Sequence, residues 1–423
     1  VGLLAKEYFN VMEDIVFDIG LTPNRVDAAS HIGVARDIIA VLNHKEKGEL
    51  QLNMPSVDNF VVENTNLSIP VTVEDPTACP RYCGVSLMDI KVGPSPDWLS
   101  NRIKAIGLSP INNVVDATNF VLHETGQPLH AFDASQIKGS EIWVKTLTKG
   151  SKFVTLDGMT IKLSSEDLMI CDKVDGMCIA GVFGGMNSGV GEHTTAIFLE
   201  SAYFEPMGIR KTSKRHGLNT DSSFRFERGA DPNVTLYALK RAAVMIKELT
   251  GGTISSDIAD HYPGPIENFK VSFNYHNCNQ LIGPALDQAL VKNILASLDI
   301  AIDKETKDGL ELSVPPYRVD VQREEDVIEE ILRIYGYNNV SIKGDVRFPM
   351  MVNQKKEDGS KEMISQLLAA AGFTEIICNS ITTTDYYEEQ DRLVRIMNPL
   401  NADLNAMRGS MLYGGLEVIL RNQ

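Results

Sequence analysis

The sequence from residue 112 to residue 133 reads NNVVDATNFVLHETGQPLHAFD. It brings together two small polar residues, Thr118 and Asn119, a turn fixed by Pro128, and the histidine His130. Thr and Asn side chains supply neutral hydrogen-bonding groups, and a histidine can orient water or a substrate hydroxyl. The structural alternative is a helix cap followed by a hydrogen-bonded core histidine, and residue chemistry alone favours that alternative. The stretch is still the first candidate for a functional site.

A second candidate is the glycine-rich run GVFGGMNSGVG from Gly181 to Gly191, which includes Gly184. Glycine allows a backbone to approach a ligand closely and to adopt positive φ. The run lacks the Gly-Lys-Ser/Thr of a P-loop and the G-x-G-x-x-G spacing of a dinucleotide-binding turn. Neither kind of nucleotide site is therefore predicted, and a plain turn is the alternative.

Glu200 is a third candidate, because it ends the apolar run from Ala196 to Leu199. A carboxylate at the end of a strand is either solvated, which is the default, or directed into a pocket. We expect strands at 141–146 and 196–200, separated by glycine-rich turns. The choice between the two interpretations of Glu200 stays open at this point.

The segment from Arg210 to Arg228 is unusually basic, with six basic residues against two acidic ones, a local net charge of +4 (six minus two). The whole chain has a formal net charge of −16, so any contact with nucleic acid must use a local basic area. RNA phosphates or an acidic partner suit such a segment, and a salt-bridged face is the alternative. The charged residues are Arg210, Lys211, Lys214, Arg215, Asp221, Arg225, Glu227 and Arg228.

A group of carboxylates follows near the sequence PPYRVD. On a helix, Asp326, Glu329 and Glu330 stand at positions i, i+3 and i+4, so they share one face, with Asp320 shortly before them. Like charges on one stripe are unfavourable without a counter-ion, and hard oxygen ligands of this kind suit Mg²⁺. The alternative is a solvated face eased by pairing of Glu329 with Arg333.

Composition limits the class of protein. The chain has 423 residues, 43% of them hydrophobic and 23% charged, values typical of a globular protein. No apolar run approaches the length of about 18 residues that spans a membrane. The six cysteines form neither a C-x-x-C pair nor a zinc set, and we expect reduced thiols in the cytosol. Both ends fall beside helix-like or apolar stretches, so we expect a fragment of a longer protein.

Pattern changes divide the chain into four parts. Residues 1–62 contain a helix capped by Ser30 but too few apolar residues for an independent core, so they should pack on another part. Residues 63–260 form the largest unit. Residues 263–340 form a small α/β module, and residues 345–423 contain a helix and a β-like run.

Several elements inside these parts are predicted from capping and apolar spacing. One helix follows Ser95-Pro96, with Ser95 as its N-cap, and ends at Gly107. The other expected helices cover residues 239–249, 290–298, 327–334 and 363–371, and the expected strands of the later parts cover 310–314 and 375–382.

Five stretches together resemble the β subunit of bacterial phenylalanine–tRNA ligase, in the family's order and along essentially the whole chain. They are TPNRVDAASHIGVARD from Thr22, NNVVDATNFVLHETGQPLHAFD from Asn112, GVFGGMNSGV from Gly181, RHGLNTDSSFRFERGADP from Arg215, and PPYRVDVQREEDVIEEILRIYGYNNV from Pro315. The resemblance implies an α+β multidomain fold. Residues 1–62 would be the remainder of an N-terminal module, and 63–260 a mixed α/β tRNA-editing domain. Residues 263–340 would be a winged-helix-like module, and 345–423 the start of a non-catalytic, class II synthetase-like antiparallel domain.

The resemblance also implies site residues. Positions that match the family's editing pocket are His130, Glu200, Thr118, Asn119, Gly184 and Thr220 for the chemistry, with Pro128 and Ser222 lining the substrate. Ser222 departs from the alanine of the relatives considered, which adds a hydroxyl to the pocket wall. The family's Mg²⁺ ligands match Asp320, Asp326, Glu329 and Glu330, at a place beside the α subunit.

The function implied is that of a β subunit in an α2β2 heterotetramer in the cytoplasm. The α subunit would carry ATP and aminoacylate tRNA(Phe), while this chain would hydrolyse mischarged Tyr-tRNA(Phe). Family members also have an N-terminal tRNA-binding insertion and a C-terminal anticodon-contacting domain, which do not occur in this sequence. Two alternatives stay open: a non-catalytic scaffold and tRNA-binding subunit with a vestigial pocket, and a general Mg²⁺-dependent enzyme.

Overall fold

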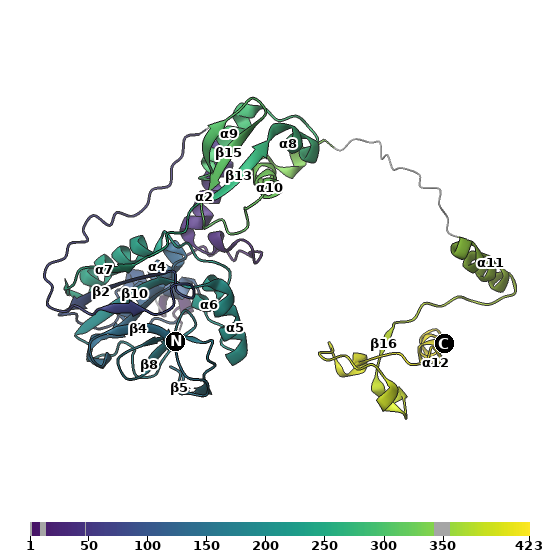
Figure 1. Cartoon of the computed structure of the whole chain (residues 1–423), viewed down its shortest axis with the longest axis horizontal. Helices are drawn as coiled ribbons and strands as arrows, with labels where there is room; N and C mark the ends of the chain where they lie inside the picture. The colour runs from purple at the N-terminus through teal and green to yellow at the C-terminus, as the bar shows by residue number, and fades with distance from the viewer. Residues whose placement is uncertain (1, 9–13, 47, 342–355) are drawn as a thin grey trace. The chain divides into compact units, whose positions relative to one another are not determined.

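The computed structural model describes residues 2–8, 14–46, 48–341 and 356–423. The chain forms two compact units, residues 1–342 and 343–423 (Figure 1). Both contain helices and strands, so the mixed α+β class predicted from the sequence is confirmed. The winged-helix-like and synthetase-like descriptions of the smaller parts stay predictions. No helix among the described residues combines the length and apolar character that crossing a membrane requires.

Two β-sheets form the centre of the first unit. One has the strand order β1-β4-β7-β8-β9, and the other has the order β11-β2-β10-β3, with β12 also paired to β2. The strands of the first sheet are β1 (Val71–Val73), β4 (Ile142–Thr146), β7 (Leu168–Cys171), β8 (Gly176–Ile179) and β9 (Phe183–Gly184). The strands of the second are β2 (Arg81–Met88), β3 (Leu129–Asp133), β10 (Ala196–Tyr203), β11 (Thr253–Ile254) and β12 (Ala259–His261). A separate hairpin joins β5 (Lys152–Val154) to β6 (Thr160–Lys162).

The second sheet is covered on both faces. Helices α4 (Asn113–Thr125) and α7 (Thr235–Thr250) pack on one face, where Val85, Ala131 and Leu199 join their apolar residues. The first sheet packs on the other face, where Phe132 and Phe198 meet its strands. Figure 1 shows the helices on one side of β2 and β10, with β4 and β8 on the other. Successive strand residues point to opposite faces, so each residue of β3 and β10 is assigned to one of these two environments.

Several shorter elements accompany these two sheets. They are α1 (Ala5–Tyr8), α3 (Asp97–Ala105), α5 (Pro206–His216), α6 (Asp221–Phe226) and the 3-10 turns η1 (Val26–Ala28) and η2 (Ala134–Gln136). The predicted N-cap role of Ser95 is wrong. Helix α3 begins after Pro96 without a side-chain cap, and the Ser95 hydroxyl donates instead to Asp116 (2.6 Å), a fully buried carboxylate that needs a donor.

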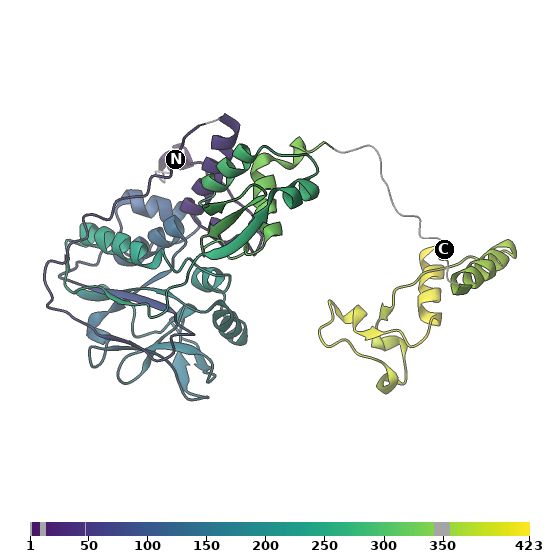
Figure 2. The same ribbon diagram turned by 45° about the horizontal axis from the view of Figure 1, so that its top comes forward.

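A three-stranded antiparallel sheet and three helices follow in the small module. They are β13 (Phe269–Asn274), β14 (Ala301–Glu305), β15 (Gly309–Val314), α8 (Tyr275–Ile282), α9 (Gln288–Ser297), α10 (Glu324–Tyr335) and the turn η3 (Tyr337–Asn339). Helix α2 (His31–Glu46) contacts α9 and α10 of this module as well as α4 (Figures 1 and 2). The prediction that the N-terminal part packs on another part is therefore confirmed. Its cap is also confirmed, because the amide of Gly33 donates to the Ser30 hydroxyl (3.0 Å).

The second unit, described by itself, contains few regular elements. They are α11 (Lys356–Ala370), β16 (Ile381–Thr382), β17 (Ala406–Met407), α12 (Leu412–Arg421) and the turns η4 (Thr384–Tyr386), η5 (Gln390–Arg392) and η6 (Ala402–Leu404). The predicted strand over 375–382 is wrong except for its last two residues. A strand needs a paired partner, and β16 finds one only in the two residues of β17, which leaves Ile377 95% exposed. Residues 345–355, where the last predicted part begins, lie outside the described residues.

Candidate functional site

Glu200 and His130 lie directly opposite each other in the second sheet. Strands β10 and β3 are antiparallel, and their register pairs Glu200 with His130. Their neighbours Phe198 and Phe132 belong to the core beneath this face, which shows that both polar side chains point toward the first sheet. Side chains of directly opposed residues have Cβ atoms about 4.5–5.5 Å apart. Two residues 70 positions apart in the sequence are thus adjacent on one face.

The Glu200 carboxyl group is buried, with 5% of the residue exposed. The phenol hydroxyl of Tyr82 on β2 donates a hydrogen bond to its Oε2 atom (2.7 Å). Burial raises the pKa of Glu200 from 4.5 to about 8, although the Tyr82 hydrogen bond acts in the opposite direction. No hydrogen bond to the other carboxyl oxygen, Oε1, comes from the described residues. The group can therefore accept one further donor, and solvation as the default interpretation of Glu200 is wrong.

This pKa predicts a pH-dependent stability. A group whose folded pKa is raised contributes stability that is present below its unfolded pKa and lost as pH rises through the folded value. For Glu200 the loss runs from pH 4.5 to about 8. In calorimetry of this chain, Glu200→Gln should gain stability relative to the unmodified chain as pH rises across that window. A stability difference that stays constant with pH would contradict the burial of an ionisable carboxyl group here.

The His130 imidazole is neutral, and its ring lies close to the glycine-rich turn at Gly184. Its Nε2 atom is covered and has no hydrogen-bond partner among the described residues, while the residue as a whole is half-buried. Burial lowers the pKa of His130 to about 4, so the imidazole is neutral at physiological pH. A Cβ atom added to Gly184 would lie 3.3 Å from the ring, which shows how closely the turn approaches. A neutral imidazole with a free nitrogen can hold a water molecule or a substrate hydroxyl.

Thr220 forms a hydrogen bond to the glycine-rich turn that approaches His130. It is the N-cap of α6, where it accepts a hydrogen bond from the Ser223 amide (3.0 Å), and its hydroxyl donates to the Val182 carbonyl (2.9 Å). Val182 lies two residues before Gly184, so Thr220 positions the turn that contacts His130. Ser222 is half-buried in the first turn of α6, and its hydroxyl forms no hydrogen bond with the described residues.

Thr118 and Asn119 are not brought beside Glu200. They lie on α4, which covers the opposite face of the second sheet, and the Thr118 hydroxyl donates to the Val115 carbonyl of its own helix (2.8 Å). Pro128 is buried just before β3, and its carbonyl accepts from the Gln127 side chain (2.9 Å). The structure thus gathers His130, Glu200, Gly184 and Thr220, with Thr118 and Asn119 across the sheet. The roles implied for all of them stay predictions.

Tyr82 is the polar neighbour that sequence reasoning missed. It lies in β2, a strand buried on both faces, and therefore shows no alternation of polar and apolar residues. A buried tyrosine usually needs a hydrogen-bond partner, which is a signal that a partner exists but does not identify it. The partner became clear only from the register, which pairs β2 with β10.

The four predicted metal ligands do not converge. Glu330 is buried and accepts hydrogen bonds from Arg318 (2.8 Å) and Arg333 (2.5 Å). Burial alone would raise the pKa of Glu330, but these two guanidinium groups lower it to about 2. Asp326 instead caps α10 through the Arg323 amide (2.9 Å). The alternative of a solvated face with Glu329 paired to Arg333 is wrong in its pairing, since Arg333 pairs with the buried Glu330.

Arg318 and Arg333 also form contacts between the small module and the N-terminal part, residues 1–62. Arg333 contacts Asp37 (3.0 Å), Arg318 lies 3.7 Å from Asp27, and Asn24 donates to Asp320 (3.0 Å). Within the described residues, no group of three or more His, Cys, Asp or Glu side chains is arranged to hold a metal ion. Glu330 in this arrangement does not fit Mg²⁺, because two guanidinium groups already bind its carboxyl group.

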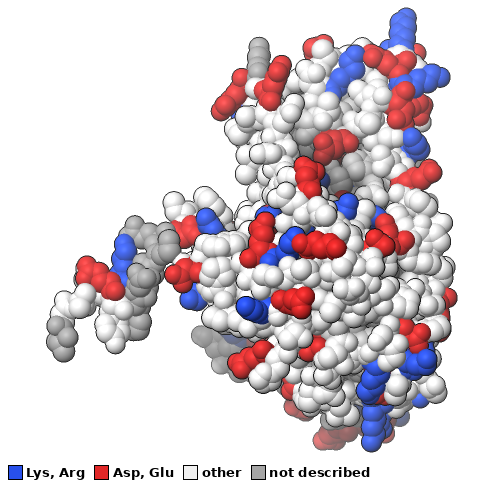
Figure 3. Space-filling view, turned by 90° about the vertical axis from the view of Figure 1, so that its left-hand side faces the viewer, with Lys and Arg blue, Asp and Glu red and all other residues white. Residues whose placement is uncertain are grey.

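The basic segment is partly neutralised by its own surroundings. Arg225 is buried against Asp221, Arg228 pairs with Glu227, and Arg215 pairs with Asp167. Four exposed basic residues lie on α5, and three of them, Arg210, Lys211 and Lys214, form no ion pair with the described residues. Figure 3 shows one face of the molecule, on which acidic and basic side chains are interspersed. The basic side chains available to contact RNA or an acidic partner are thus confined to one side of helix α5.

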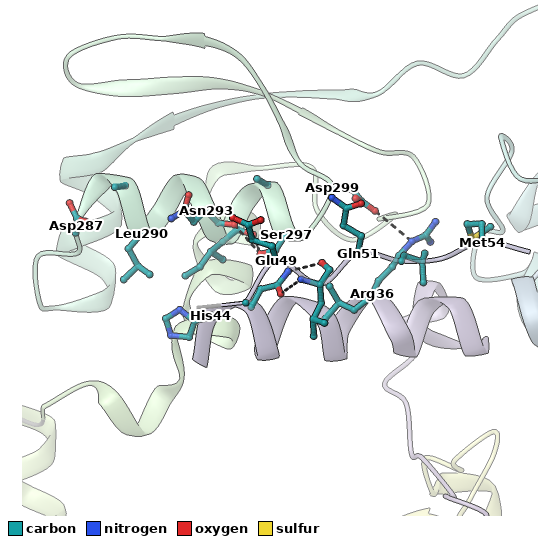
Figure 4. A pocket seen from close by; sticks show the side chains of 18 residues that line it. Arg36, His44, Glu49, Gln51, Met54, Asp287, Leu290, Asn293, Ser297 and Asp299 are labelled. Atoms are coloured by element: carbon teal, nitrogen blue, oxygen red, sulfur yellow. Dashed lines mark hydrogen bonds and ion pairs between the residues drawn. The ribbon is translucent and has the colours of Figure 1, made fainter. Parts of the chain in front are cut away.

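A cavity of about 1000 Å³ lies elsewhere, between α2, α9 and the segment 48–54 (Figure 4). Arg36, Asn43 and His44 line it from α2, and Leu290 and Asn293 line it from α9. Two hydrogen bonds between the Asn43 side chain and the Leu50 backbone hold the segment against α2 (3.0 and 2.8 Å). The cavity contains none of the residues predicted to form the site.

Three family models match successive parts of the chain. A model described as B3/4 domain matches residues 78–251, one described as tRNA synthetase B5 domain matches 271–337, and one described as Phenylalanyl tRNA synthetase beta chain CLM domain matches 347–423. The first covers most strands of the two packed sheets, including β3 and β10, which hold His130 and Glu200. The matches place the chain among the subunits of aminoacyl-tRNA synthetases.

Curated relatives name the subunit. Proteins called phenylalanine–tRNA ligase beta subunit from Bacteroides fragilis (53% identity), Bacteroides thetaiotaomicron (52%) and Porphyromonas gingivalis (50%) align with 100% of this chain. The chain belongs to the family of phenylalanine–tRNA ligase beta subunits and spans about half the length of these relatives (52%). A solved N-terminal fragment of the phenylalanyl-tRNA synthetase beta-subunit from Pyrococcus horikoshii covers 74% of this chain and 85% of its own at 17% identity, with a TM-score of 0.36, too low for a detailed comparison.

Proposed function

We propose that this chain is the part of a phenylalanine–tRNA ligase β subunit that hydrolyses mischarged Tyr-tRNA(Phe). The observation that carries the proposal is the pairing of Glu200 with His130 on one face, with Glu200 Oε1 free to accept a hydrogen bond. Tyrosine differs from phenylalanine by one hydroxyl. A site built to pair that hydroxyl rejects the analogue lacking it, because the site's own polar group would be left unpaired.

In this proposal the ionised form of Glu200, whose share grows as pH rises toward the pKa of about 8, accepts the phenol hydrogen bond of the tyrosyl group. His130, which is neutral, orients the attacking water or the ester, and the backbone near Gly184 stabilises the developing oxyanion. The hydrogen bond from Thr220 to Val182 supports the position of that turn. Thr118 and Asn119 would reach the ester end only around the edge strand β3, and Pro128 and Ser222 would line the substrate. The sequence predicts no nucleophilic triad, so the proposal uses positioned water.

The assembled enzyme is part of the same proposal. An α subunit would use ATP to aminoacylate tRNA(Phe) in an α2β2 assembly in the cytoplasm, where the free cysteines described here would stay reduced. Mg²⁺ could bind Asp320, Asp326, Glu329 and Glu330 only if Glu330 exchanged its arginine partners for the ion. The exposed basic side of α5 is the candidate contact for tRNA phosphates.

The proposal is tested by deacylation of Tyr-tRNA(Phe) and Phe-tRNA(Phe) by the assembled enzyme. We expect kcat/KM for the tyrosyl ester to exceed that for the phenylalanyl ester by at least about a hundredfold. Equal and low rates for the two esters would instead support a scaffold with a vestigial pocket. That second candidate is favoured by one observation, the position of Thr118 and Asn119 across the sheet from Glu200.

A further inference from the structure

We propose that Tyr82 is a positioning residue for Glu200: its hydroxyl holds one carboxyl oxygen so that the other receives the phenol of the substrate. This inference rests on the proposed function and extends it to a residue outside the predicted site. The hydrogen bond from Tyr82 to Oε2 (2.7 Å) is its geometric basis. Tyr82 is fully buried, so its hydroxyl has no solvent to exchange with.

The register of β2 and β10 explains why this tyrosine reaches the carboxyl group. Glu200 pairs with Gly84, and Tyr82 pairs with Ala202, so Tyr82 lies diagonally across from Glu200 on the same face. The Phe198 ring lies over Gly84, where an added Cβ would come within 2.1 Å of it. The position directly opposite Glu200 on β2 is thus closed by an aromatic ring. Tyr82 and Ser86 are the two diagonal neighbours on that strand, and the Tyr82 hydroxyl is the one that donates to Glu200.

Tyr82 itself presents a phenol to Glu200. The carboxyl group therefore already accepts the kind of donor that distinguishes tyrosine from phenylalanine. With Oε2 occupied, the carboxyl plane and the direction of Oε1 are fixed in advance, so less side-chain freedom is lost when a second phenol binds. A carboxylate has two oxygens and can accept both donors at once.

Of the ionisable groups that face Glu200, Tyr82 has the strongest influence in favour of the ionised carboxylate. They are Tyr82 from β2, Cys79 before that strand, His130 from β3 and Cys178 from β8. The two thiols are buried and protonated, because burial raises the pKa of each well above its ordinary value. His130 is neutral. Among these groups, the Tyr82 hydrogen bond is the contact that favours the ionised, purely accepting form of Glu200.

The test measures deacylation of Tyr-tRNA(Phe) across pH by the assembled enzyme carrying Tyr82→Phe. We expect kcat/KM to fall by about tenfold and the acid limb of the pH profile to move to higher pH, since the ionised carboxylate loses a charge-assisted hydrogen bond. Tyr237→Phe is the matched control. It also removes a hydroxyl hydrogen bond, to the Pro55 carbonyl (2.9 Å), but from α7 on the other face of the sheet, and it should leave both quantities unchanged.

Replacement of Tyr82 by 3-fluorotyrosine covers the case in which the phenylalanine variant does not fold. This analogue keeps the shape and makes the hydroxyl a stronger donor, so the acid limb should move to lower pH. An unmoved profile in either Tyr82 variant, in an enzyme that prefers Tyr-tRNA(Phe), would overturn the role of Tyr82 and leave the proposed function intact. Absence of the preference in the unmodified enzyme would overturn the proposed function itself.

Discussion

Replacement of Glu200 by alanine in the assembled enzyme is expected to abolish most of its preference for Tyr-tRNA(Phe) over Phe-tRNA(Phe), by about a hundredfold. The magnitude follows from the loss of a hydrogen bond between a phenol and a carboxylate in a water-poor site, worth about 1.5–3 kcal/mol. The measurement is the ratio of kcat/KM for deacylation of the two esters. The loss should fall on the tyrosyl ester, because the phenylalanyl ester has no hydroxyl for Glu200 to recognise.

Two controls separate recognition from folding. Glu192→Ala removes an exposed carboxylate shortly before β10 and should leave the ratio unchanged. Glu200→Gln keeps an accepting oxygen, so its ratio should lie between those of the unmodified and alanine enzymes. Because Glu200→Ala leaves the Tyr82 hydroxyl without its partner, its unfolding temperature is measured beside the rates. A folded alanine variant with an unchanged ratio would show that Glu200 does not recognise the phenol.

Replacement of Arg318 by alanine is expected to lower the free energy of unfolding by about 3 kcal/mol, the second large effect. Arg318 is 2% exposed and bonds Glu330 at 2.8 Å. Its removal leaves a buried carboxylate whose remaining partner within the described ranges is Arg333. Thermal unfolding of this chain measures the change. The matched control is Arg323→Ala, an exposed arginine paired with Asp326, which should leave the free energy of unfolding nearly unchanged.

The same ion pair predicts an acid dependence. The pKa of Glu330 is lowered from 4.5 to about 2, and a depressed carboxyl pKa contributes stability that is present above the unfolded value and lost as pH falls through the folded one. The stability difference caused by Arg318→Ala should therefore be complete above pH 4.5 and shrink toward pH 2. A difference that stays the same at pH 3 would mean that the pair contributes little.

The helices of the first unit could be predicted because their signals are local. The cap Ser30, the glycine after α7 and the apolar spacing of α10 lie within a few residues of the elements that they define. The prediction of a helix cap failed at Ser95, where a residue distant in the sequence competed for the hydroxyl. Ser95 could have capped α3, but the buried carboxylate of Asp116, 21 residues away, takes its hydroxyl.

The site was predicted residue by residue, but its arrangement was not. The resemblance supplied His130 and Glu200, whereas their adjacency depends on the register of β3 and β10, which no local pattern encodes. For the same reason Tyr82 was missed, and Thr118 was grouped with residues from which a sheet separates it. The prediction for the acidic stripe around Glu330 failed differently. Arg333 of the same helix pairs with Glu330 rather than Glu329, and Arg318, which lies before the helix, pairs with Glu330 as well.

The most direct test is a crystal structure of the assembled enzyme with tyrosine bound. The proposed site predicts the phenol oxygen within hydrogen-bond distance of Glu200 Oε1, the ring between Glu200 and the turn at Gly184, and the tyrosine carboxyl group beside His130. Tyrosine bound on the far side of β10 from Glu200, or excluded from this face at concentrations that saturate editing, would contradict it.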